Sequence, residues 1–299
     1  MQDSVRRELL NFVYGVIQLE FQKSVINIIQ ERVSCRSFES SKDIDGITLQ
    51  KLGDIIDAIN TEAKTKARFV FANKQVKSDG SAEKLGTYGM ISGANSFIIG
   101  IVDKDQQNPL EFGYLFEKIV LFATDLGLQT CWLGGTFNRD DFEQKTSLSE
   151  NEFIPIVSPV GFKKEQPRIF DKAVRAFIGA NNRKPWGQLF FEENLSKPLG
   201  EDGAGEFNNV LEMVRLAPSA SNKQPWRIIK DKREYHFFLR RTKNYAMTRY
   251  DMQKNDMGIA MCHFELTAKE LGLQGGWTEK QPVNAPTEWE YITTWSDGI

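Results

Sequence analysis

Apolar and polar positions along this chain repeat with two periods, one typical of helices and one typical of strands. Residues 1–30 predict two helices, the second at 23–30, and a third helix is expected to begin at Thr48 as its N-cap. Residues 67–74 and 96–102 are predicted strands, and the second is apolar throughout, as in a buried strand. Residues 111–126 predict a helix that is apolar nearly all round and is therefore buried on most sides.

The pattern continues with a strand at 153–162 and then changes character. Residues 181–206 are rich in turn formers and mixed charge and have little periodicity, which indicates a crossover between two halves. After it we expect a helix at 206–216, strands at 226 and 235–239, another apolar helix, and a last strand at 288–294. Because helices and strands interleave in both halves, the sequence predicts an α+β or layered α/β fold.

One segment occurs twice. Residues 111–132, EFGYLFEKIVLFATDLGLQTCW, align without a gap with residues 256–277, DMGIAMCHFELTAKELGLQGGW. Both copies contain Leu-Gly-Leu-Gln near the end and finish at a tryptophan, Trp132 or Trp277. An apolar helix used twice predicts a duplicated unit folded against itself. We place the two halves at residues 1–190 and 191–299.

Composition narrows the class of protein. With 299 residues, 40% hydrophobic and 26% charged, the chain has the profile of a soluble globular protein. A formal net charge of −2 provides no broad basic field, so nucleic acid is not an expected partner. Three unclustered cysteines and two histidines offer no zinc-like ligand set, and they fit a reducing, cytoplasmic setting. No window approaches the roughly 18 apolar residues of a membrane span.

The first chemically suggestive segment is Arg32-Val-Ser34-Cys-Arg36, directly after a predicted helix. If it is extended, its two guanidinium groups and one hydroxyl point the same way. Arginine offers paired donors that match phosphate oxygens, so the segment could bind a phosphate. Taken alone, the pattern is more typical of a solvated basic turn.

Two further segments carry unusual composition. Residues 217–226, APSASNKQPW, bracket small polar residues and amides between two prolines, which favours a rigid loop rich in donors and acceptors. Gly134 and Gly135 follow the first copy of the repeat. A glycine pair either lets the backbone approach a flat ligand closely or simply allows a turn.

In this order, the three segments resemble those of the FMN-dependent nitroreductase family. The resemblance implies an α+β nitroreductase-like fold, in which FMN lies between two subunits of an obligate dimer. It implies that Arg32, Ser34 and Arg36 bind the flavin phosphate and reach the pyrimidine ring, and that the 218–226 loop covers the flavin. The cofactor-binding residues predicted on this basis are Arg32, Ser34, Arg36, Tyr88, Gly134, Gly135, Arg183, Pro218, Ser219, Ala220 and Asn222.

Two members of this set are placed by position alone. Arg183, near Pro185, matches a basic residue with which the family binds phosphate, although it also fits a solvated linker. Tyr88 is placed loosely near the pyrimidine ring. No side chain is assigned a catalytic role and no metal is predicted.

The departures from the family pattern are informative. The first half has TEAKTK at 61–66, where the proline-flanked loop is expected, and the second half has NLSKPLGED at 194–202, with no arginine. Each half lacks what the other keeps. The sequence therefore predicts a fused pseudo-dimer, monomeric or weakly homodimeric, with one intact FMN site and one vestigial pocket.

The resemblance also implies an activity. NAD(P)H would reduce FMN in a ping-pong cycle, and a nitroaromatic, quinone or similar small-molecule acceptor would then take the electrons. The alternative is a non-catalytic FMN-binding protein that serves as a store or sensor, with residues 188–206 as a lid over the substrate cavity.

Overall fold

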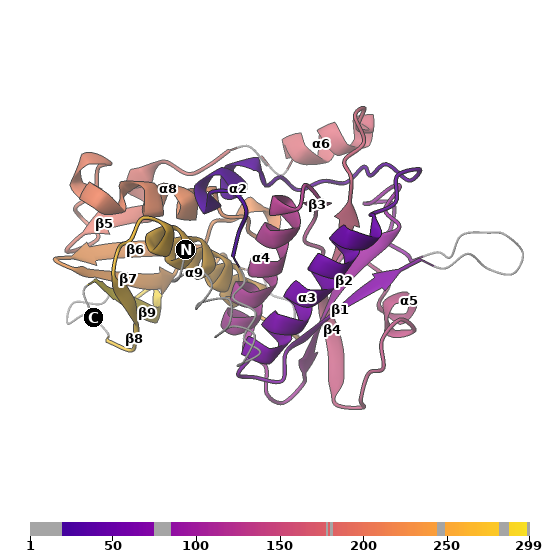
Figure 1. The fold of residues 1–299 in the computed structure, drawn as a ribbon. Coiled ribbons are helices and arrows are strands. Elements are labelled where there is room, and N and C mark those ends of the chain that lie inside the picture. The colour runs from indigo at the N-terminus through magenta and orange to yellow at the C-terminus, as the bar shows by residue number, and fades with distance from the viewer. Residues whose placement is uncertain are drawn as a thin grey trace, which may run out of the picture.

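The computed structural model describes residues 20–74, 85–177, 179, 182–243, 249–280 and 287–297, which form two α/β units around two long helices (Figure 1). The first helix predicted within residues 1–30 lies outside these residues. The first unit contains α2 (Val25–Glu31), α3 (Gly46–Glu62), β1 (Arg68–Asn73), β2 (Ser96–Asp103), α4 (Pro109–Asp125), β3 (Gln129–Thr130), α5 (Arg139–Glu143), β4 (Glu152–Gly161) and α6 (Ile169–Phe177). There follow α7 (Trp186–Leu189), β5 (Phe190–Glu192), η1 (Asp202–Phe207), α8 (Asn208–Leu216), η2 (Ala220–Asn222), β6 (Trp226–Asp231), β7 (Glu234–Leu239), α9 (Met252–Glu270), β8 (Gly275–Thr278) and β9 (Glu290–Asp297).

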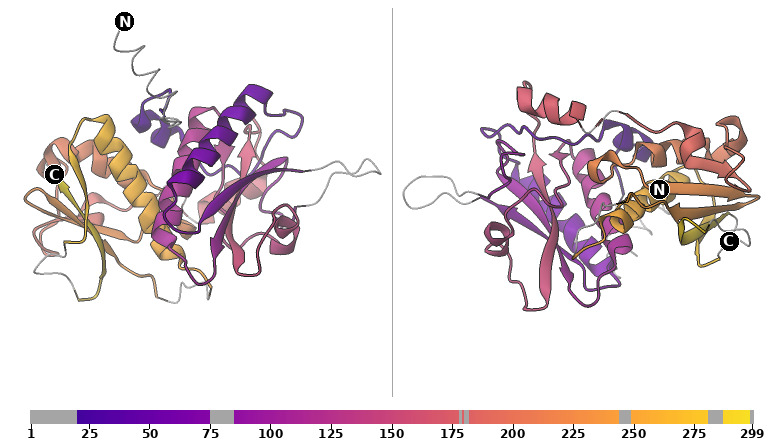
Figure 2. Two further views of the ribbon diagram at one scale, coloured as in Figure 1. Left: turned by 60° about the horizontal axis from the view of Figure 1, so that its bottom comes forward. Right: turned by 180° about the vertical axis from the view of Figure 1, so that it is seen from behind.

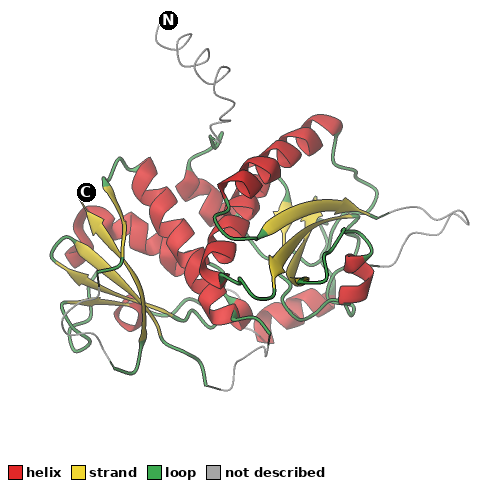
Figure 3. Ribbon diagram, turned by 90° about the horizontal axis from the view of Figure 1, so that it is seen from below, coloured by secondary structure: helices red, strands yellow, loops and turns green. Residues whose placement is uncertain are grey.

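Each unit is built on one sheet, and the long helices α4 and α9 lie between the two sheets (Figure 3). The first sheet has the order β1-β2-β4-β3 and is antiparallel throughout. The second has the order β5-β6-β7-β9-β8, in which only β5 and β6 are parallel. The chain leaving the first unit thus adds an edge strand to the sheet of the second. The predicted α+β fold is confirmed.

The two repeated helices, α4 and α9, pack on each other in the centre of the molecule (Figure 2). The repeated glycines lie where they cross. A Cβ on Gly113 would lie 2.1 Å from the carbonyl oxygen of Asn255, and one on Gly258 would lie 2.0 Å from that of Leu110. Backbones come this close only where side chains are absent. Most residues of both helices are buried, as the sequence predicts.

Two predicted helix starts are wrong. α3 begins at Gly46, because the Asp45 carboxylate accepts hydrogen bonds from the backbone N–H groups of Ile47 and Thr48, both at 3.0 Å. Thr48 lies inside the first turn and donates its hydroxyl to the same carboxylate. α8 begins at Asn208 instead of residue 206, since Gly205 has a φ of 58°, which interrupts the helix.

Candidate functional site

The three predicted segments meet at two adjoining cavities. One, of about 250 Å³, is lined by Arg32, Arg175 and Arg183 among others. The other, of about 470 Å³, is lined by Arg36 and Gly135 among others. Residues shared by both cavities are Ser34, Pro218 and Ser219. Ten of the predicted cofactor residues line one or both cavities: Arg32, Ser34, Arg36, Gly134, Gly135, Arg183, Pro218, Ser219, Ala220 and Asn222.

Tyr88 is not brought together with the others. Its side chain is 70% exposed and lines neither cavity. It lies in a turn with a φ of 47°, followed by Gly89 with a φ of 74°. A left-handed turn of this kind directs Tyr88 to solvent, while Met90, two residues later, lines the larger cavity.

The Arg-x-Ser-x-Arg segment is extended because it leaves α2 beside β3. Ser34 forms an isolated parallel β-bridge with Thr130, and the Cys35 N–H donates to the Thr130 carbonyl at 2.9 Å. Side chains alternate across an extended backbone. Arg32, Ser34 and Arg36 therefore face the cavities, as predicted, while Cys35 is buried on the other side.

Arg36 provides the clearest indication of a ligand-binding site. It is half-buried, and its Nε and Nη1 are shielded from solvent without a hydrogen-bond partner among the described residues. Buried donors are almost always paired, and a guanidinium requires acceptors. A Cβ on the nearby Gly135 would meet nothing within 4 Å, so the backbone there opens on the cavity. The phosphate, ring nitrogens and carbonyls of FMN are acceptors of the required kind, and these residues fit the cofactor.

Arg32 belongs to a buried network that the sequence did not predict. Its Nε lies 3.8 Å from Oε1 of Glu117, a fully buried carboxylate. That carboxylate also accepts a hydrogen bond from Trp132 Nε1 at 2.9 Å and lies 2.9 Å from His263 Nε2. Burial lowers the pKa of Arg32, and the negative charge of Glu117 opposes this shift. Arg32 thus faces the cavity while balancing a charge in the core.

The Glu117–His263 contact extends this network. On the other side of the ring, His263 Nδ1 lies 2.9 Å from the carbonyl oxygen of Met213. Since His263 is on α9 and Glu117 on α4, this pair joins the two central helices.

The 217–225 loop is strained and firmly held. Ser221, Asn222 and Gln224 have φ values of 48°, 54° and 47°, a backbone conformation that residues other than glycine rarely adopt. Asp256 on α9 accepts the Ala220 N–H at 3.0 Å. Burial raises the pKa of Asp256 well above its usual range. Strain that the surroundings maintain in this way is typical of ligand-binding loops.

Arg183 fixes the same loop from the first half of the chain. Its guanidinium donates to Asn222 Oδ1 at 2.9 Å and to the Leu216 carbonyl at 3.0 Å. Burial, followed by the charge of Arg32, lowers the pKa of Arg183 to about 10, so it stays protonated at neutral pH. Asn222 also donates to the carbonyls of Gly179 and Asn182, so its amide holds the loop in shape.

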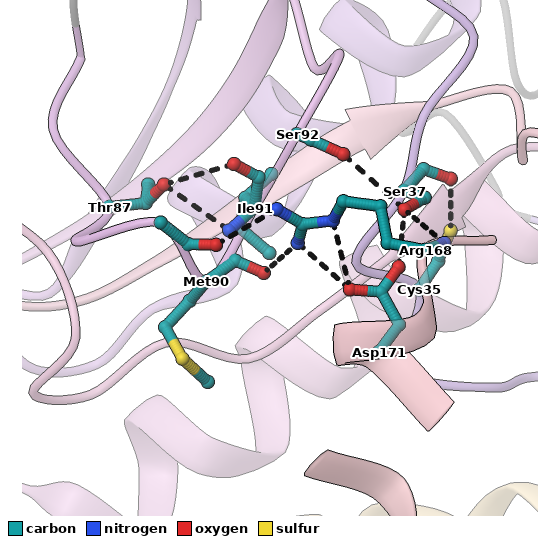
Figure 4. Close-up of polar contacts among 9 residues, drawn as sticks. Cys35, Ser37, Thr87, Met90, Ile91, Ser92, Arg168 and Asp171 are labelled. Carbon is teal, nitrogen blue, oxygen red and sulfur yellow. Dashed lines mark hydrogen bonds and ion pairs between the residues drawn. The ribbon is translucent and has the colours of Figure 1, made fainter. Parts of the chain in front are cut away.

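α6 lies beside both cavities and is anchored by the network in Figure 4. Arg168 donates to the carbonyls of Gly89 and Met90, both at 3.0 Å, and pairs with Asp171 at 2.8 Å. Asp171 also accepts the hydroxyl of Ser37, which follows the arginine segment. This network joins three segments that are distant in sequence and fixes the start of α6 against the site.

Residues 24–268 match the family described as "Putative TM nitroreductase". The chain belongs to this family. Membership makes it an oxidoreductase of nitroreductase type.

At least one solved structure shares this fold over nearly the whole chain. This nitroreductase is similar to a "putative nitroreductase" from Thermotoga maritima MSB8, with 19% identity and a TM-score of 0.55 over 94% of this chain and 97% of that one. A nitroreductase family protein from Clostridium difficile 630 has 19% identity and a TM-score of 0.39, covering 55% and 94%. An FMN-dependent nitroreductase from C. difficile R20291 has 16% identity and a TM-score of 0.35, covering 48% and 90%. No curated protein sequence matches the chain.

The sequence analysis of this nitroreductase missed Arg175, Glu117 and Asp256. Arg175 on α6 lines the smaller cavity, and its Nη1 donates to the Ser34 carbonyl at 3.4 Å. The only available signal was the Arg168-x-x-Asp171 spacing, which places an ion pair on one helical face. Glu117 and Asp256 are acidic residues on helices that are buried along most of their length, a pattern that indicates a buried partner. Among the described helices, none is long and apolar enough to cross a membrane.

Proposed function

We propose that this chain binds FMN and uses NAD(P)H to reduce nitroaromatic, quinone or similar small-molecule acceptors. The observation that carries the proposal is the Arg36 side chain, whose buried Nε and Nη1 have no partner among the described residues, in a cavity lined by both halves of the chain. When bound, FMN supplies the electron transfer between reductant and acceptor, and the protein binds and orients the reactants. Membership of a nitroreductase family supports this assignment.

The smaller cavity is suited to the FMN phosphate. Arg32, Arg175 and Arg183 line it together with the hydroxyl-bearing Ser34. Both Arg32 and Arg175 lower the pKa of Arg183, which is the effect of like charges held close together. A bound phosphate offsets this repulsion and accepts the paired donors that arginine presents.

The larger cavity is suited to the flavin ring and a second flat ligand. Arg36 would meet acceptors of the pyrimidine ring, and Gly134 and Gly135 would bring the backbone beside it. Apolar side chains of Met90, Trp132, Val174, Met252 and Ile259 line the remainder. Walls of this kind exclude water and accept aromatic compounds with little selectivity.

We further propose that residues 1–190 and 191–299 are the halves of a fused pseudo-dimer in the cytoplasm, monomeric or weakly homodimeric. The matching crossing glycines support this, and so do two matching acidic residues at the start of the repeat. Glu111 accepts the N–H groups of Lys64 and Thr65, at 2.7 and 3.0 Å, as Asp256 accepts that of Ala220. Each therefore holds the loop after the preceding helix, α3 or α8.

The halves differ where the flavin would bind. After Trp132, the backbone makes one isolated bridge at Leu133 and then lines the larger cavity. In the second copy, Trp277 and the following residue, Thr278, remain paired with Trp295 and Thr294 of β9. This supports a single functional FMN site.

We expect the FMN-loaded protein to be yellow and to lose this colour when NADH or NADPH reduces the flavin. The purified chain, loaded with FMN, should lose its oxidised-flavin absorbance when mixed anaerobically with NADH or NADPH, and an acceptor should restore it. Failure to gain flavin absorbance on incubation with FMN would contradict the proposal. Flavin that stays oxidised with both NADH and NADPH would indicate an FMN store or sensor instead.

Stoichiometry tests the single site separately. We expect one FMN per chain, measured as flavin absorbance after acid release against protein concentration from quantitative amino-acid analysis. Two FMN per chain would show that the second pocket is functional and would refute the vestigial-pocket argument.

A further inference from the structure

A third, open pocket lies on the outer side of the 221–224 loop. Its volume is about 460 Å³. Ser221 lines both this pocket and the larger cavity, and Asn222 lines both this pocket and the smaller one. The outer pocket is thus separated from the proposed FMN site only by a loop.

Positive charge gathers at this outer pocket. Lys184 and Lys223 line it. The Lys184 ammonium donates to the backbone carbonyls of Lys223 and Gln224, at 2.7 and 3.3 Å, which fixes it to the loop. Burial lowers the pKa of Lys184 to about 8, and so do the charges of Arg227, Arg240 and Lys223. Every neighbouring charge that shifts the pKa of Lys184 is positive, so this cluster of cations attracts an anion.

A cation at the outer pocket is next in sequence to a cation at the smaller cavity. Arg183 lines the smaller inner cavity, whereas its neighbour Lys184 lines the outer pocket. Pro185 follows, and a residue that precedes proline is held extended, so successive side chains point to opposite sides. One short segment therefore serves two neighbouring sites, both suited to phosphate.

An exposed aromatic ring stands at the same pocket. Phe177, at the end of α6, lines it and is 93% exposed. The ring is therefore open to a ligand that enters the pocket. Bases stack on aromatic side chains, so an exposed ring beside cations suits a purine nucleotide.

We propose that the outer pocket binds the adenosine-phosphate half of the nicotinamide dinucleotide, with the adenine on Phe177 and a phosphate near Lys223. The nicotinamide half then passes the 221–222 loop into the larger cavity. This inference rests on the proposed function, because that function makes the dinucleotide a substrate.

The test uses ADP, which both NADH and NADPH contain, as a probe that requires no electron transfer. Calorimetric titration should show binding to the FMN-loaded protein. The double variant Phe177→Ala/Lys223→Met should weaken it at least tenfold. Ile47→Ala/Lys51→Met, which removes an exposed apolar side chain and a cation elsewhere on the surface, is the matched control and should bind as the wild type does. Absence of binding, or equal binding by all variants, would overturn the proposal.

Kinetics separates this pocket from the flavin site. In the double variant, KM for NADPH should rise while KM for reduced nicotinamide mononucleotide, which lacks the adenosine phosphate, stays constant. Equal changes for both reductants would overturn the proposal. If the protein proved to bind no FMN, titration of the flavin-free chain would still test the pocket, and the proposed function alone would fail.

Discussion

Replacing Arg36 by methionine should weaken FMN binding about 10- to 100-fold without loss of the fold. Hydrogen bonds to a charged group contribute about 1.5–3 kcal/mol, and every 1.4 kcal/mol is a tenfold change in Kd. The side chain has two buried nitrogens without a partner, so its removal costs the FMN-free protein no hydrogen bond from those atoms. Stability without FMN should therefore be unchanged or higher. Fluorescence titration with FMN and thermal unfolding measure the two effects.

Arg233→Met is the control for this experiment. Arg233 is exposed and pairs with Asp297 far from the cavities, so its loss should leave the Kd for FMN unchanged. An Arg36→Met protein with wild-type affinity for FMN would refute the assignment of Arg36. Arg32 is a poorer choice, because its removal leaves the buried Glu117 without a neighbouring positive charge and so destabilises the fold.

Alanine at Gly258 should separate the two central helices. Its Cβ would lie 2.0 Å from a backbone oxygen of α4, which cannot rotate away as a side chain can. Overpacking costs about 1–3 kcal/mol, and a clash with backbone belongs at the upper end. Asp256, two residues earlier, holds the 217–225 loop, so FMN affinity should fall as well. Gly113→Ala should cause a similar loss of stability by the reciprocal clash.

Gly53→Ala is the matched control within α3. A Cβ there would meet nothing within 4 Å, so alanine should raise the free energy of unfolding by about 0.5–1 kcal/mol through its helix propensity. Urea unfolding of the three variants measures the difference. If Gly258→Ala unfolded at the same urea concentration as Gly53→Ala, close contact of α4 and α9 would not be a source of stability.

Much of the fold was predictable because local patterns determine it. Residues 96–102 are apolar throughout and become β2, the buried second strand of the first sheet. The helix starts were less accurate: a stronger cap at Asp45 and a left-handed Gly205 prevailed over the apolar periodicity. The pairing of β5 with β6 had no local signal, since three residues carry too little pattern to indicate a partner.

The candidate site also contains residues that the sequence could place and residues that it could not. Arg32, Ser34 and Arg36 could be placed in one line because alternation along an extended segment is a local property. Arg175 could not, since it reaches the cavity only through the Arg168 and Asp171 contacts that fix α6. Tyr88 was included on sequence position alone and lies in a turn exposed to solvent.

The sequence by itself determined the type and order of most of the longer elements, the repeat and the residue types that could bind an anion, because these depend on neighbours along the chain. Only the tertiary structure decided which of those residues share a cavity. It also showed that Glu117 balances Arg32 and that Lys184 and Phe177 meet at an outer pocket. These relations depend on the packing of α4 against α9 and of α6 against the cavities, which no local pattern specifies.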